Sequence, residues 1–99
     1  MREYKGYQLR QTHEQFEKWM QRAGIPTEGM DVLYIAGNKH LIRIDGYTFC
    51  VYNYYVGTIR ASNGYHFSGA KEVLTLPDRS KQHVYGYPEA LKIIYDNWK

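Results

Sequence analysis

Apolar and polar residues alternate most regularly in the middle of the chain, over three short runs that are rich in β-branched and aromatic side chains. The runs span residues 32–36, 39–44 and 47–52. Gly37-Asn38 separates the first two runs and Asp45-Gly46 the last two. Both pairs are typical of the tight turns with positive φ that join antiparallel strands. The pattern therefore predicts an antiparallel β-meander.

The two turns also predict how the strands pair. A two-residue loop at each turn places Leu33 opposite Ile42 and Ile42 opposite Phe49, and directly opposed residues share a face of the sheet. The predicted core face holds Leu33, Ile35, His40, Ile42, Ile44, Tyr47, Phe49 and Val51. The opposite face is mixed and holds Val32, Tyr34, Lys39, Leu41, Arg43, Thr48, Cys50 and Tyr52. Either a helix covers this mixed face, or it is an exposed tyrosine-rich surface for interaction.

Apolar residues at helical spacing predict one helix on each side of the meander. The first covers residues 13–23, with Thr12 as its N-cap and Gly24 in position to end it. Its apolar stripe consists of Phe16, Trp19, Met20 and Ala23. The second covers residues 88–98 and begins at Pro88, a residue favoured in the first helical turn. Its apolar stripe consists of Leu91, Ile94, Tyr95 and Trp98.

The remaining segments complete an α+β fold. They comprise a short strand at residues 4–9, a bulge or turn near Asn53-Tyr54, a hairpin turn at Asn63-Gly64, a strand at residues 71–76 and a polar loop at residues 77–82. The sequence thus predicts a single domain over residues 1–99, an antiparallel meander of about four to five strands with an N-terminal and a C-terminal helix packed on it. The predicted core contains Phe16, Trp19, Met20, Leu33, Ile35, Ile42, Ile44, Phe49, Val51, Leu91, Ile94 and Trp98.

Composition limits the cellular setting. The formal net charge is +3 and the pI is ≈ 9.0, yet no segment carries a run of basic residues. With Cys50 as the one cysteine, the chain forms no internal disulfide. The N-terminus lacks the apolar segment of a signal peptide, and no apolar run has the length of a membrane span. We expect a cytoplasmic protein that does not enter a membrane.

The sequence contains no motif for a metal, a cofactor or a catalytic group. Its histidines lie far apart, without the paired spacing of metal ligands. Cys50 lies in mid-strand, without neighbours in the sequence that would activate a thiol. We therefore expect a non-enzymatic protein without cofactor or metal, in which Cys50 is structural. A small metal-independent ribonuclease that uses His66 or Arg60 is the enzymatic alternative.

Tyrosine is the most unusual feature of the composition, at 11 of 99 residues. Tyrosine is enriched at protein interfaces, so the sequence predicts a protein or nucleoprotein partner. An inhibitor or accessory factor of the kind carried by phages and mobile elements would fit this description. A homodimer through the same surface is one alternative. Direct nucleic-acid binding is another, since aromatic rings and arginine can stack on bases.

The predicted binding surface lies on the mixed face of the meander. Alternation places Tyr34, Arg43, Tyr52 and Tyr54 on that face. Should those tyrosines be buried, the binding site would instead lie around Tyr65, Arg79 and Lys81. The complete set of predicted binding residues is Tyr34, Arg43, Tyr52, Tyr54, Arg60, Tyr65, Arg79 and Lys81.

Overall fold

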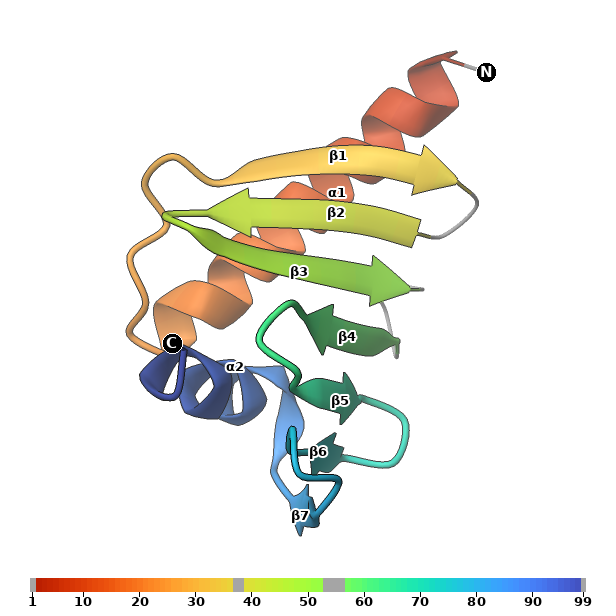
Figure 1. Ribbon diagram of the computed structural model, residues 1–99. Coiled ribbons are helices and arrows are strands. Elements are labelled where there is room, and N and C mark those ends of the chain that lie inside the picture. The colour runs from red at the N-terminus through yellow and green to blue at the C-terminus, as the bar shows by residue number, and fades with distance from the viewer. Residues whose placement is uncertain (1, 37–38, 53–56, 99) are drawn as a thin grey trace.

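The strands form one antiparallel sheet of seven, in a computed structural model that describes residues 2–36, 39–52 and 57–98. Each strand pairs with the next along the chain, as a meander requires (Figure 1). The strands are β1 (Asp31–Ala36), β2 (Lys39–Ile44), β3 (Tyr47–Tyr52), β4 (Thr58–Ala61), β5 (His66–Ser68), β6 (Val73–Thr75) and β7 (Lys81–His83). The predicted α+β meander is confirmed, but the strand count exceeds the four to five expected. Strand β7 overlaps the predicted polar loop at residues 77–82. Its sequence shows no strand pattern, because all three of its side chains are exposed and no apolar residue alternates with them.

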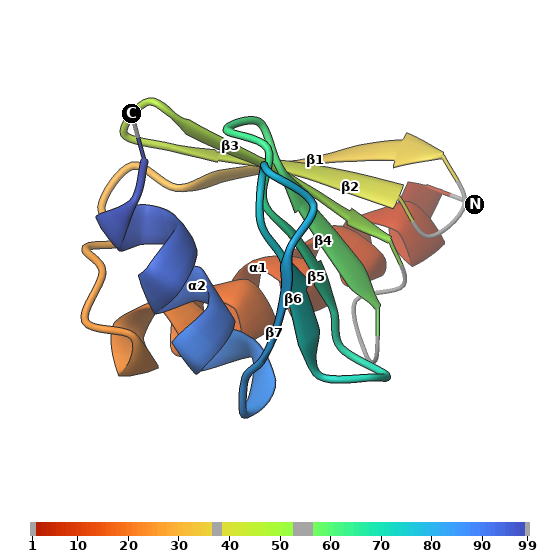
Figure 2. The same cartoon turned by 60° about the horizontal axis from the view of Figure 1, so that its bottom comes forward.

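Two helices pack on the same face of the sheet, α1 (Arg2–Arg22) and α2 (Gly86–Asp96). Figure 1 shows α1 passing behind the sheet, and Figure 2 shows both helices on one side of it. In the part of the chain that the structure describes, no helix covers the opposite face. We call this uncovered surface the open face of the sheet.

Helix α1 begins earlier than the sequence pattern predicts. It starts at Arg2, so the expected strand at residues 4–9 is helical and the N-cap prediction for Thr12 is wrong. Thr12 is instead buried within the helix, with its Oγ1 3.5 Å from Nε2 of the buried His40 on β2. Leu9 lies seven residues before Phe16 and extends the same helical face. Packing against the sheet therefore outweighs the local preference of Thr12 for a helix terminus.

The C-terminus of α1 follows its local sequence. Gly24 has a φ of +78°, the left-handed conformation that glycine adopts without strain. The Ile25 amide donates to the Met20 carbonyl at 2.9 Å and the Gly24 amide donates to the Gln21 carbonyl at 3.0 Å. These two bonds form a Schellman motif, and the buried Ile25 supplies its apolar contact.

The predicted register of the first hairpin is wrong. Val32, rather than Leu33, pairs with Ile42, and a bulge separates Tyr34 from Ala36. One extra residue in a strand transfers the residues before it to the other face. Leu33 and Ile35 are therefore exposed, by 38% and 46%, instead of belonging to the core as expected. The turn residues 37–38 lie outside the described part of the chain.

The second and third hairpins are confirmed. Ile42 pairs with Phe49 as predicted, and Asp45 and Gly46 have φ values of 47° and 82°, as a type I′ turn requires. The turn that contains Asn63 and Gly64 joins β4 to β5. The bulge predicted near Asn53-Tyr54 lies outside the described residues.

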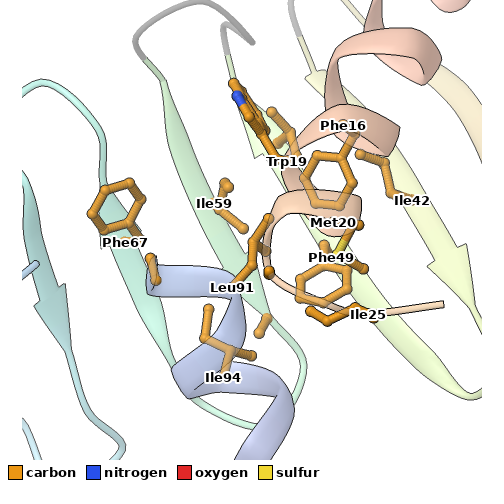
Figure 3. Packing of buried hydrophobic residues seen from close by; sticks show 14 of the residues in the cluster. Phe16, Trp19, Met20, Ile25, Ile42, Phe49, Ile59, Phe67, Leu91 and Ile94 are labelled. Atoms are coloured by element: carbon orange, nitrogen blue, oxygen red, sulfur yellow. The ribbon is translucent and has the colours of Figure 1, made fainter. Parts of the chain in front are cut away.

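The core lies between the sheet and the two helices (Figure 3). Phe16 of α1 faces Phe49 of β3, with ring centroids 5.5 Å apart. Helix α2 contributes Leu91 and Ile94, both fully buried, while Trp98 is only partly buried against the same cluster.

Helix α2 begins two residues before Pro88, and the Glu89 carboxylate accepts a hydrogen bond from the Tyr85 amide at 3.0 Å.

Candidate binding surface on the open face

The pairing of the strands places the side chains of the open face in two rows that cross the sheet. The first row consists of Lys39, Tyr52, Thr58, Ser68, Val73 and His83. The second row consists of Leu41, Cys50, Arg60, His66, Thr75 and Lys81. Neighbouring residues within a row belong to adjacent strands, which are about 4.8 Å apart. The open face is thus mixed over β1 to β3, where apolar side chains alternate with charged and hydroxyl groups, and mostly basic and hydroxylic over β4 to β7.

Tyr52 lies between two cations. The Lys39 ammonium is 5.4 Å from the centroid of the Tyr52 ring, and the Arg60 guanidinium carbon is 6.0 Å from it. Both distances are within the range of cation–π attraction. Tyr52 is only partly buried, so the pair of cations fixes an aromatic ring that still reaches solvent.

A groove of about 510 Å³ lies on the same face beside this tyrosine. It is lined by Thr58, His66, Ser68, Lys71, Val73, Thr75 and Lys81. Its polar groups are hydroxyls, an imidazole and two ammonium groups, and the lining contains no carboxylate. Hydroxyl and ammonium donors suit an anionic ligand.

The pKa of His66 is lowered from its ordinary value of 6.5. Burial is the largest cause, and the positive charges of Arg60 and Lys81 follow. Burial would lower this pKa in any surroundings, but the contributions of Arg60 and Lys81 show that the local potential at His66 is positive. The same potential would attract an anion.

A second groove, of about 370 Å³, meets the first at His66 and Thr75. Arg79 lines it from the β6–β7 loop. The carboxylate of Asp78 holds this loop, since it accepts hydrogen bonds from the Ser80 amide at 3.0 Å and the Ser80 hydroxyl at 2.6 Å. These bonds also lower the pKa of Asp78.

The balance of charges on the open face is positive. Arg43 forms an ion pair with Asp31 at 3.7 Å, and His83 lies 3.7 Å from Glu72. Among the described residues, no ion pair includes the other cations of the open face and its turns. These cations are Lys39, Arg60, Lys71, Arg79 and Lys81.

The structure brings some of the predicted binding residues together and separates others. Arg43, Tyr52, Arg60 and Lys81 share the open face, and Arg79 lies at its edge. The placement of Tyr34 beside them was wrong, because the bulge in β1 moves it to the helix-covered face. There its ring meets that of His40 with centroids 5.8 Å apart.

Of the other two predicted tyrosines, the structure describes only Tyr65. Tyr65 is buried, with 8% of its surface exposed, but it lines the second groove together with Arg79, and Tyr54 lies outside the described residues. Tyr85 is 76% exposed, and its ring centroid lies 4.9 Å from that of His83, at the end of the first row.

Sequence reasoning did not select several residues of this surface. They are Lys39, Thr58, Ser68, Lys71 and Thr75, while His66 was named only for the ribonuclease alternative. A signal was present, because the hairpin at Asn63-Gly64 alternates apolar and polar residues on both strands. With Ile59 and Phe67 assigned to the core, Arg60 and His66 must lie together on the other face.

Comparisons with known proteins found no match, so a proposal for the function has to be based on the geometry of the open face. No family model, no curated protein and no solved structure matches this chain. Within the described ranges, no helix is both long and apolar enough to cross a membrane. The described residues also contain no cluster of three or more histidine, cysteine or acidic side chains that could hold a metal ion.

Proposed function

We propose that this protein binds single-stranded nucleic acid across the open face of its sheet. The position of Tyr52 between Lys39 and Arg60, in a row that leads into a basic groove, is the observation that carries the proposal. An aromatic ring flanked by cations can stack on a base while the cations neutralise neighbouring phosphates. In this proposal the protein is a non-enzymatic, cytoplasmic binding domain.

A single strand fits this surface better than a duplex. The bases of a duplex stack on one another, so they offer no ring face to Tyr52. A single strand exposes both its bases and its phosphates. The rows of side chains from β3 to β7 extend over roughly 19 Å at the usual spacing between strands, which accommodates several nucleotides.

A protein partner is the second candidate, and one observation favours it. Leu33 and Ile35 are exposed on β1, next to the apolar part of the open face around Leu41. An inhibitor or accessory factor could use this patch together with the basic groove to hold an acidic protein surface. Four cations lie beside Tyr52 or line the groove, against two exposed aliphatic side chains on β1, so nucleic acid is our first proposal.

Fluorescence anisotropy of a labelled 12-nucleotide oligo-dT tests the proposal directly. If Lys39 and Arg60 each neutralise one phosphate and Lys71 and Lys81 together neutralise a third, the slope of log K against log salt should be about −2.1. Affinity should then fall roughly 20-fold between 50 and 200 mM NaCl. Replacing Tyr52 with alanine should weaken binding by roughly 5- to 150-fold, the equivalent of one lost stacking contact of about 1–3 kcal/mol.

Tyr52→Phe is the matched control, because it keeps the ring and removes only the hydroxyl. It should bind oligo-dT nearly as well as the natural sequence, and a duplex of the same length should bind more weakly than the single strand. The proposal is wrong if oligo-dT does not bind at 50 mM NaCl, or if Tyr52→Ala binds it unchanged. Binding of an acidic protein, lost on changing Leu33 or Ile35, would then support the second candidate.

A further inference from the structure

We infer that the groove over β4 to β7 is a phosphate-binding subsite, positioned so that a base stacked on Tyr52 places a neighbouring phosphate in it. This inference rests on the proposed nucleic-acid binding and deepens it. It assigns the parts of the open face to different parts of a nucleotide. Tyr52 takes the base, and Lys71 and Lys81 take the phosphate.

The donors around the groove come from separate strands and converge on one space. Thr58 of β4 and Ser68 of β5 pair directly, and Thr75 of β6 pairs with Lys81 of β7. Lys71 approaches from the turn between β5 and β6. Three hydroxyls and two ammonium groups thus line one groove, in which the ammonium groups of Lys71 and Lys81 can bind an anion and the hydroxyls can donate to it.

The charges near the groove favour an anion. His66 lines it from β5, with Arg60 paired to it on β4, and both Arg60 and Lys81 act on the His66 charge. Arg79 of the β6–β7 loop lines the adjoining groove together with His66. Glu72, next to Lys71 in the chain, lies 3.7 Å from His83. A phosphate would relieve the mutual repulsion of these cations, which an uncharged ligand would not do.

The distance from the tyrosine supports the division of roles. Tyr52 and Thr58 are paired across β3 and β4, so the groove begins one strand, about 4.8 Å, from the ring. Arg60 links the two parts, because it lies near the Tyr52 ring and also perturbs His66. A single nucleotide can therefore contact the aromatic ring and the groove together.

The test uses the full chain labelled with ¹⁵N and inorganic pyrophosphate as the probe, at low salt. Pyrophosphate should shift the backbone amide signals of Thr58, Ser68, Lys71 and Lys81 in particular. The double variant Lys71→Gln/Lys81→Gln should bind pyrophosphate at least about tenfold more weakly, the loss of two charge-assisted contacts. For oligo-dT, the same variant should reduce the salt slope by about 0.7, since the one phosphate contact that both lysines share is lost.

The matched control is Lys18→Gln/Arg22→Gln, which removes the same charge from exposed positions on α1. It should leave pyrophosphate binding unchanged. Shifts scattered over all basic residues, or equal weakening by both double variants, would overturn the subsite even if oligo-dT still binds the open face. Localised pyrophosphate binding without any binding of oligo-dT would support the subsite and overturn the nucleic-acid function instead.

Discussion

At Gly69 the chain has no room for a side chain, because the hydroxyl of Tyr87 occupies the space where a Cβ would lie. The Gly57 carbonyl, 2.8 Å from that position, closes it from the other side. This carbonyl accepts hydrogen bonds from the Gly69 amide at 2.9 Å and from the Tyr87 hydroxyl at 3.1 Å. Tyr87 also stacks on Trp19, with ring centroids 3.8 Å apart. A single glycine thus allows α2, α1 and the sheet to meet.

Replacing Gly69 with alanine should destabilise the protein by about 1–3 kcal/mol, the usual cost of forcing a methyl group into a packed space. The measurement is urea unfolding followed by tryptophan fluorescence. In the double variant Gly69→Ala/Tyr87→Phe the clashing hydroxyl is absent. The loss of unfolding free energy in this variant should therefore be smaller than the sum of the losses in the two single variants. Strict additivity of the two changes would contradict this account.

At the scale of elements, local sequence signals explain the parts that were predicted correctly. Asp45-Gly46 and Gly24 specify their turns because the required positive φ depends on those residues alone. The apolar stripes of α1 and α2 are likewise local patterns. Strand β1 is different, because its register depends on a bulge between Tyr34 and Ala36, and no local sequence motif predicts this bulge.

The register of β1 can be tested by comparing two aliphatic truncations in the paired strands β1 and β2. Ile42→Ala should cost about 2–5 kcal/mol of unfolding free energy, because Ile42 is fully buried and leaves a cavity. Leu33→Ala should cost about 1 kcal/mol or less, since Leu33 is 38% exposed on the open face. Urea unfolding of both variants gives the comparison. Equal losses would mean that Leu33 belongs to the core, as the simple alternation of β1 predicts.

Considered as a whole molecule, the protein divides its aromatic residues between two tasks. Four tyrosines, Tyr47, Tyr65, Tyr87 and Tyr95, pack in or against the core. Tyr47 packs against Tyr95 and Trp98, with ring centroids 4.9 and 4.7 Å away, and Tyr65 is buried. On the open face, by contrast, the Tyr52 ring lies near the cations of Lys39 and Arg60. The abundance of tyrosine therefore reflects the packing of a small domain at least as much as a binding surface.

Cys50 provides a reporter for the open face, since it is the one cysteine and is partly exposed beside Arg60. We expect the native protein to react with a small thiol reagent such as DTNB without unfolding. Saturating oligo-dT should slow this reaction at least about fivefold, because a strand lying across Tyr52 and Arg60 covers the thiol. The rate is followed by absorbance, with a non-binding neutral polymer as the control. An unchanged rate under saturation would place the bound strand on another surface.

The sequence by itself determined the α+β class, the meander, the helix stripes and the turns at Gly24, Asp45-Gly46 and Asn63-Gly64. Each depends on backbone conformations or periodicities set by residues close together in the chain. Tertiary structure decided three further features: the early start of α1, the reversed faces of β1 and the pairing of the fully polar strand β7. It also decided that both helices cover one face, which leaves Tyr52 and the basic groove open. These features depend on contacts between residues far apart in the chain, where the gain from burial outweighs local preference.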